Sequence, residues 1–112
     1  MTLDELASQF RRMWIDPNVR QLGQLLHEWK TTEATVADLS ATVERYFGTV
    51  EIKSETERER AFVAWSRFRE EVIDRIGGMT MNERLYRLGL FERFDSDESA
   101  RSIIYQKLLA CP

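Results

Sequence analysis

Histidine and cysteine, the residue types that most often carry catalysis or bind metals, each occur once in this chain, as His27 and Cys111. A metal site needs several such ligands at fixed spacing. Helical di-iron proteins place a glutamate three residues before a histidine, but the residue three before His27 is Gln24. Cys111 has no basic neighbour that would activate its thiol. We therefore expect no catalytic residue, no metal and no cofactor, and we interpret His27 as a partly exposed structural residue.

Carboxylates are numerous, yet along the predicted helices they alternate with arginines. The run Glu57-Arg58-Glu59-Arg60 is typical of a solvated face whose charges pair with one another. Gly77-Gly78 precedes a predicted helix but lacks the lysine and the strand of a phosphate-binding loop, and we interpret this pair as a left-handed helix stop. The GxSxG motif of serine hydrolases is absent from the sequence. These observations predict a protein that is not an enzyme.

Aromatic side chains stand beside acids in residues 79–99, a combination typical of an anchor that enters a basic partner's pocket. A second acidic cluster stands on the connector before the longest predicted helix. The candidate partner-binding residues are Tyr86, Phe91, Asp95, Asp97 and Glu98 in the first cluster, and Glu51 and Glu55 in the second. Another interpretation stays open for each cluster. The aromatics can be core residues whose acidic neighbours cap the last helix, and the connector acids can simply interact favourably with a helix dipole.

The longest apolar stripe lies in residues 54–78. Ser54 followed by Glu57 predicts a capping box at its start. Large apolar residues then recur at steps of three and four, at Phe62, Trp65, Phe68, Val72, Ile73 and Ile76. At 1.5 Å per residue such a helix is roughly 33 Å long, enough to cross most of a domain of this size. We therefore predict a long central helix at about residues 55–76.

Two short motifs mark the starts of the first two predicted helices. They are the capping box Thr2-x-x-Glu5 and the pair Asp16-Pro17, an N-cap followed by proline at the first helical position. The first helix is expected at about residues 3–14, with Met13 and Trp14 on its apolar stripe. The join between these two helices is very short, so they are expected to form a tight corner or hairpin.

Glycines are expected to end or interrupt two further helices, at Gly48 and Gly89. After Gly48, the residues TVEIK (49–53) alternate polar and apolar, but no second segment can pair with them as a strand, so we expect an extended connector. The sequence thus predicts a single all-α domain spanning residues 1–112. Its expected architecture is a compact bundle of about five to six helices around the long central helix.

Charge excludes other classes of function. The 16 basic and 19 acidic residues give a net charge of −3, and no segment is basic. Nucleic-acid binding needs a concentrated basic face, so we expect no nucleic-acid partner. No apolar window is long enough to span a membrane, and Asp4 and Glu5 stand where a signal peptide needs lysines. With a lone cysteine, which suits a reducing compartment, these features predict a cytoplasmic protein without a membrane partner.

The segment NERLYRLGLFERFD (residues 82–95) resembles a motif of short bacterial proteins. In size, acidity and helical pattern the whole chain is similar to the immunity proteins of contact-dependent growth inhibition and related bacterial toxin systems. The resemblance implies a cytosolic protein that binds a cognate nuclease toxin and blocks its active site or substrate groove. Acidic side chains would then replace RNA phosphates against the basic residues of the toxin. No contact residue is carried over from it.

A helical adaptor or regulatory subunit without catalytic activity is the alternative interpretation. Such a protein can be a monomer or a homodimer. In a dimer, the predicted contact is the apolar face from Leu22 to Trp29 or the edge of residues 49–53.

Overall fold

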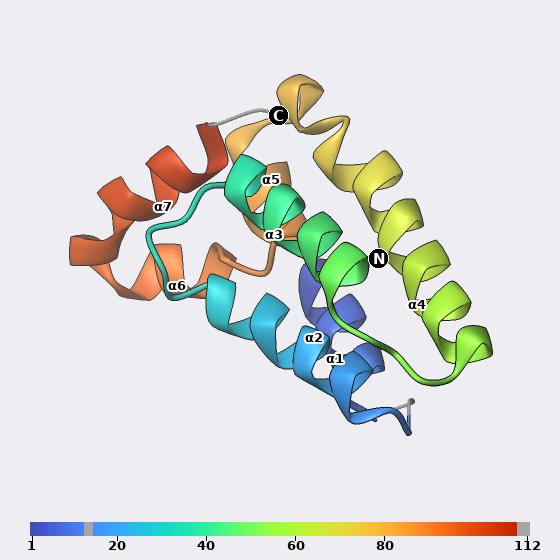
Figure 1. Ribbon diagram of the computed structural model, residues 1–112. Coiled ribbons are helices and arrows are strands. Elements are labelled where there is room, and N and C mark those ends of the chain that lie inside the picture. Colours follow the sequence, from blue (N-terminus) through green and yellow to red (C-terminus); the bar gives the residue numbers. More distant parts are fainter. Residues whose placement is uncertain (13–14, 110–112) are drawn as a thin grey trace.

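The computed structural model describes residues 1–12 and 15–109, and all regular structure in these ranges is helical. The seven α-helices of the described ranges (Figure 1) are α1 Leu3–Arg12, α2 Pro17–Trp29, α3 Val36–Thr49, α4 Glu55–Phe68, α5 Met81–Arg87, α6 Phe91–Ser96 and α7 Arg101–Leu109. The predicted all-α fold class is therefore confirmed. The helices outnumber the predicted five to six because Gly89, with a φ of 70°, divides α5 from α6. Met13 and Trp14 lie outside the described residues.

The long helix predicted at about residues 55–76 is present as a bent rod along one side of the molecule (Figure 1), against α1 and α3. Its three pieces are α4, the π-helical turn Arg69–Ile73 and the 3₁₀ turn Ile76–Gly78. After the π-helical turn the Asp74 N–H donates to the Arg69 carbonyl at 2.8 Å. That bond reaches back five residues rather than four, which widens and bends the helix.

Of the glycines predicted to end or interrupt helices, Gly48 and Gly77-Gly78 do not adopt the left-handed conformation. Gly48 lies inside α3, which continues to Thr49, and Gly77-Gly78 belong to the final 3₁₀ turn of the long helix. Gly89 is the glycine that has a positive φ in the described ranges. The long helix does end at Gly78, as predicted, but without a left-handed residue. The predicted stop at Gly48 is wrong, because α3 continues through this residue to Thr49.

The tight corner predicted between the first two helices is present, and α1 and α2 pack closely. Gly23 permits this approach, because a Cβ at that position would lie 2.7 Å from Arg11 Cγ and 2.8 Å from the Ala7 carbonyl oxygen. Asp16 caps α2 as predicted, accepting a hydrogen bond from the Asn18 N–H at 2.8 Å. The α2 face that was expected as a possible dimer contact is in the core, since Leu22 and Leu26 are fully buried.

The buried stripe of the long helix differs from the prediction at one position. Its core residues are Ala61, Trp65, Phe68, Val72, Ile73 and Ile76. Phe62 is instead 45% exposed. Successive residues of a helix are separated by about 100°, so a stripe that runs through Ala61 turns Phe62 away from the core. The prediction of Phe62 as a core residue is wrong.

Lys107 on α7 occupies a position that the sequence did not single out. Its side chain is fully buried, and its ammonium donates to the carbonyls of Trp29 at 2.7 Å, Thr32 at 2.6 Å and Ala34 at 2.6 Å. The nitrogen also lies 4.0 Å from the centroid of the Trp29 ring. Burial, and to a smaller extent the Arg93 charge, lower the pKa of Lys107 to about 8, while the Asp38 charge opposes the shift. This lysine therefore ties α7 to the α2–α3 junction.

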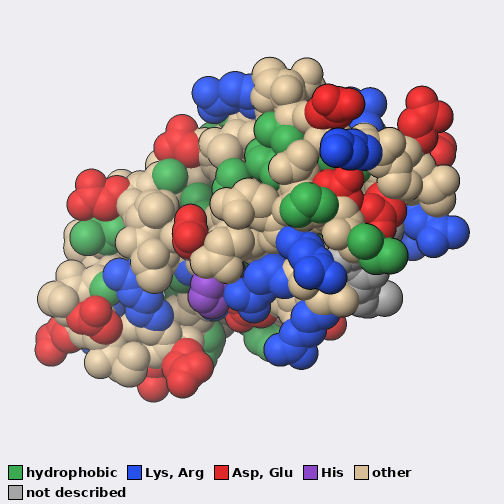
Figure 2. Space-filling view, turned by 60° about the horizontal axis from the view of Figure 1, so that its bottom comes forward, with side chains coloured by type: hydrophobic (Ala, Val, Ile, Leu, Met, Phe, Trp, Pro, Cys, Tyr) green, Lys and Arg blue, Asp and Glu red, His purple; other side chains and the backbone are tan. Residues whose placement is uncertain are grey.

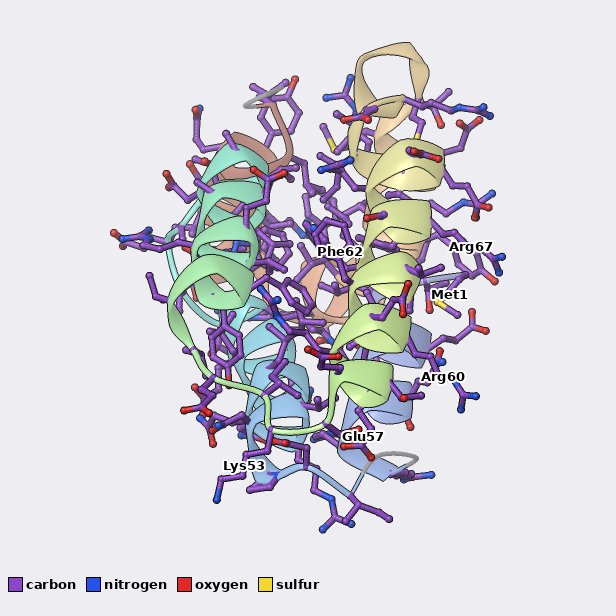
Figure 3. The ribbon with its side chains drawn as sticks, turned by 45° about the vertical axis from the view of Figure 1, so that its right-hand side comes forward. Met1, Lys53, Glu57, Arg60, Phe62 and Arg67 are labelled. Atoms are coloured by element: carbon purple, nitrogen blue, oxygen red, sulfur yellow. The ribbon has the colours of Figure 1, made fainter. Side chains whose placement is uncertain are left out.

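Glu57 joins the start of α4 to the α1–α2 corner (Figure 3). The Ser54 hydroxyl accepts from the Glu57 N–H at 3.2 Å, as predicted. The Glu57 carboxylate, however, accepts from the main-chain N–H groups of Ile15 at 3.0 Å and Asp16 at 3.1 Å. Lys53 N–H donates to the Asp16 carboxylate at 3.0 Å, which holds the connector against the start of α2. Thr49, predicted as part of this connector, is instead the last residue of α3. The fold thus holds the N-terminus of α4 in a fixed place.

Candidate functional site

The two predicted clusters lie far apart. Tyr86 belongs to α5, near the centre of Figure 1, and Phe91 to α6, toward the left, whereas the connector that leads into α4 is at the lower right. The structure therefore does not bring the seven predicted residues into one site.

In the first cluster the aromatic side chains are at the surface. Tyr86 is 64% exposed and Phe91 is 49% exposed, so neither is a core residue. Asp97, by contrast, accepts from the Ser99 N–H at 3.1 Å and from the Ser99 hydroxyl at 2.7 Å. These hydrogen bonds lower the pKa of Asp97. Asp97 is thus a capping residue, as one of the two interpretations held, while Asp95 and Glu98 are exposed.

In the second cluster Glu55 lies at the edge of a groove between α3 and α4. The groove, with a volume of 570 Å³, is lined by Glu44, Phe47 and Gly48 of α3 and by Glu55, Arg58, Glu59 and Phe62 of α4. We call it the acidic groove. Glu51 lies beyond it, in the adjoining depression around the connector, which Glu55 also lines. Glu55 therefore links the two hollows.

Helical spacing aligns the residues of the acidic groove. Glu55, Glu59 and Phe62 stand at i, i+4 and i+7 on α4, so they form one stripe along the helix. In Figure 3, Phe62 points from α4 toward α3. Its ring meets Phe47 edge to face, with centroids 5.3 Å apart and planes at 89°. Opposite, Gly48 leaves the groove open, because a Cβ there would meet no atom within 4 Å.

The basic residues near the groove are already engaged by the fold. Arg58 donates to the Phe47 carbonyl at 2.7 Å, and Arg69 forms an ion pair with Glu44 at 2.8 Å. Glu55 and Glu59 are both exposed and form no hydrogen bond or ion pair through their side chains with the described residues. A half-exposed aromatic ring that follows two carboxylates on the same stripe of a helix can receive an arginine or lysine side chain by stacking and ion pairing.

The remaining predictions concern His27, Cys111, metal binding and membrane-spanning helices. His27 is exposed on α2, near a group of arginine and lysine side chains (Figure 2), and Cys111 lies outside the described residues. In residues 1–12 and 15–109, no cluster of three or more histidine, cysteine or carboxylate side chains has the arrangement of a metal site. None of the helices in these ranges combines the length and apolar character needed to cross a bilayer.

Sequence reasoning found Glu55 but missed the rest of the acidic groove. One signal was present: Ala61, Trp65, Phe68 and Val72 stand at i, i+4, i+7 and i+11, a stripe that runs through Ala61 and excludes Phe62. The partners on α3 could not be found, because no local pattern tells which helices lie side by side.

Comparison of the chain with protein-family models, with curated proteins and with solved structures finds no match.

Proposed function

We propose that this chain is an immunity-type inhibitor. It acts in the cytoplasm, where it binds a cognate nuclease toxin and covers the toxin's active site or substrate groove. It neutralises the toxin by binding alone, without catalysis and without a cofactor. The contact surface on this chain is the acidic groove, and the basic residues that the toxin uses against RNA or DNA phosphates are the groups that the groove receives.

One observation supports this proposal above the others: Phe62 is 45% exposed at the end of a stripe of α4 whose two carboxylates, those of Glu55 and Glu59, form no hydrogen bond or ion pair with the described residues. An exposed aromatic ring costs solvation free energy unless a partner covers it. Aromatic side chains in the centre of an interface, surrounded by charges complementary to the partner, contribute most of the binding free energy in many complexes. Unpaired carboxylates also accelerate association with a basic surface.

The test is co-expression with the toxic domain encoded beside this gene. We expect this chain to restore growth and to bind the toxin in a 1:1 complex whose association slows as salt is added. A variant Glu55→Lys/Phe62→Ala should weaken binding by about 100-fold, a loss of roughly 2.7 kcal/mol, and should no longer protect. Circular dichroism and thermal unfolding establish that the variant is folded.

Two control variants make the result specific to the acidic groove. Glu70→Lys, at an exposed position of the same long helix, should leave protection unchanged. Phe91→Ala/Glu98→Lys alters the first predicted cluster and should change binding by less than about threefold. The proposal is overturned if the chain protects against no neighbouring gene product. It is equally overturned if the Phe91→Ala/Glu98→Lys variant loses protection while the acidic-groove variant keeps it.

A further inference from the structure

The side of α4 that faces α1 carries a second groove, which shares Glu59 with the acidic groove but none of its other residues. This groove, with a volume of 540 Å³, lies between α1 and α4 and is lined by Gln9, Glu59, Arg60, Val63, Ala64 and Arg67, among others. We call it the basic groove. In Figure 3, Arg60 and Arg67 extend from the side of α4 opposite Phe62, and Met1 lies on that side as well.

The arginines of the basic groove are not used by the fold. Several other guanidinium groups donate to main-chain carbonyls or to a carboxylate, namely those of Arg58, Arg84, Arg93, Arg101 and Arg69. Arg60 and Arg67 are exposed and make no hydrogen bond or ion pair with the described residues. Their charges are therefore available to a partner.

The charge of this surface is positive in a protein that is acidic overall. Arg60 and Arg67 face one carboxylate, that of Glu59. An adjoining depression shares Gln9 and adds Arg12. Of the two acids of that depression, Asp4 forms an ion pair with Lys30 at 2.8 Å, whereas Glu5 accepts from the Thr2 N–H at 3.1 Å and keeps its negative charge. The residues that line the basic groove itself thus carry two positive charges and one negative charge.

The spacing of the groove residues indicates the kind of partner. Arg60 and Arg67 are seven residues apart on α4, which places them about 10.5 Å apart along the helix axis. Between them lie Ala64 and Val63, and Val63 is 44% exposed. A helix with carboxylates at i and i+7 and apolar residues at i+3 and i+4 presents the complementary pattern. We infer that the basic groove binds an acidic amphipathic helix of a partner protein.

Two other occupants fit the groove less well. A nucleic acid would set phosphates against Val63 and Ala64, which offer no hydrogen bond. It would also bring a polyanion close to the acidic groove on the other side of α4 and to a chain of net charge −3. A second copy of this chain would have to supply an acidic helix with exposed apolar residues, and the stripe of Glu55, Glu59 and Phe62 carries its aromatic residue at the end rather than in the middle.

The experiment uses the full chain and a synthetic probe. The probe is a fluorescein-labelled, 15-residue helical peptide with two glutamates seven positions apart and leucines at the third and fourth positions between them. Fluorescence anisotropy at 50 mM and 300 mM NaCl measures its binding. We expect saturable 1:1 binding that weakens at the higher salt concentration. The charge reversal Arg60→Glu/Arg67→Glu should reduce affinity by at least about tenfold.

The matched control is Arg45→Glu/Arg75→Glu, which reverses two exposed arginines outside the groove and should change affinity by less than about twofold. Glu55→Lys/Phe62→Ala should also keep peptide binding. The two proposals can therefore fail independently: loss of toxin inhibition does not contradict peptide binding, and absence of peptide binding does not contradict toxin inhibition. The inference is overturned by absence of peptide binding. It is also overturned if a scrambled peptide of equal charge binds equally well, if poly(U) displaces the peptide, or if sedimentation shows a dimer that Arg60→Glu/Arg67→Glu dissociates.

Discussion

Replacement of Glu57 by alanine tests how strongly the α1–α2 corner depends on the long helix. The Glu57 carboxylate accepts from two main-chain N–H groups, those of Ile15 at 3.0 Å and Asp16 at 3.1 Å, which lie 42 and 41 residues away in the sequence. In the variant both N–H groups lose this acceptor. They also lose a negative charge at the N-terminus of α2, where the helix dipole favours an anion.

The expected loss follows from the surroundings of the two N–H groups. Ile15 is 83% exposed, so water replaces the lost acceptor there, and the cost is about 0.5 kcal/mol. Asp16 is only 7% exposed. An N–H left without an acceptor in such a place costs roughly 1–3 kcal/mol. We therefore expect Glu57→Ala to reduce the free energy of unfolding by about 2–3 kcal/mol, which lowers the melting temperature of a domain of this size by about 10 °C.

Urea unfolding followed by circular dichroism measures this loss, with Glu59→Ala as the control. Glu59 is exposed on the same helix and makes no hydrogen bond through its side chain with the described residues, so its replacement should change stability by less than about 0.5 kcal/mol. Both variants replace glutamate by alanine in α4, so the gain in helix propensity is the same and cancels when their stabilities are compared. Glu57→Gln keeps one acceptor oxygen and should fall between the two. Equal unfolding midpoints for Glu57→Ala and Glu59→Ala would refute the reasoning.

Three further outcomes are expected in unfolding experiments. Gly48→Ala should stabilise the chain by about 0.5–1 kcal/mol, because Gly48 is inside α3 and its added Cβ meets no atom within 4 Å. Gly23→Ala should destabilise it by roughly 1–3 kcal/mol, because the added Cβ would lie 2.8 Å from the Ala7 carbonyl oxygen. The pKa of Lys107 is lowered to about 8 in the folded chain, so the unfolded chain binds more protons between that pH and the ordinary pKa of lysine. The stability of the wild type relative to Lys107→Met should therefore rise as the pH increases through this range, as urea unfolding at pH 7.5 and pH 10 can measure.

Short-range patterns in the sequence correctly predicted the helix caps that depend on residues close together in the chain. Asp16 caps α2 through the Asn18 N–H, and Thr2 with Glu5 forms the predicted capping box. These interactions span two or three residues, so the local order of residue types is enough to determine them. The all-α class follows in the same way, because apolar residues at steps of three and four recur along most of the chain.

The same reasoning failed where two local alternatives were almost equal. Glu57 was placed in a capping box with Ser54, but its carboxylate instead binds N–H groups more than 40 residues away. Phe62 was assigned to the core because it stands three residues before Trp65 on the predicted stripe, although Ala61, one residue earlier, is fully buried there. In both cases a segment distant in the sequence determined the position of the side chain. The sequence of one helix does not tell which segment will lie beside it.

Amino-acid sequence alone therefore determined the helical class of this protein and the starts of α1, α2 and the long helix, because those features depend on contacts within one turn. The tertiary structure decided which charges remain free. Arg58 and Arg69 are engaged by the carbonyl of Phe47 and the carboxylate of Glu44 on α3, whereas Arg60 and Arg67 on the same rod are not. Packing pairs some charged side chains of α4 with α3 and leaves others exposed. For this reason α4 has an acidic groove on one side and a basic groove on the other.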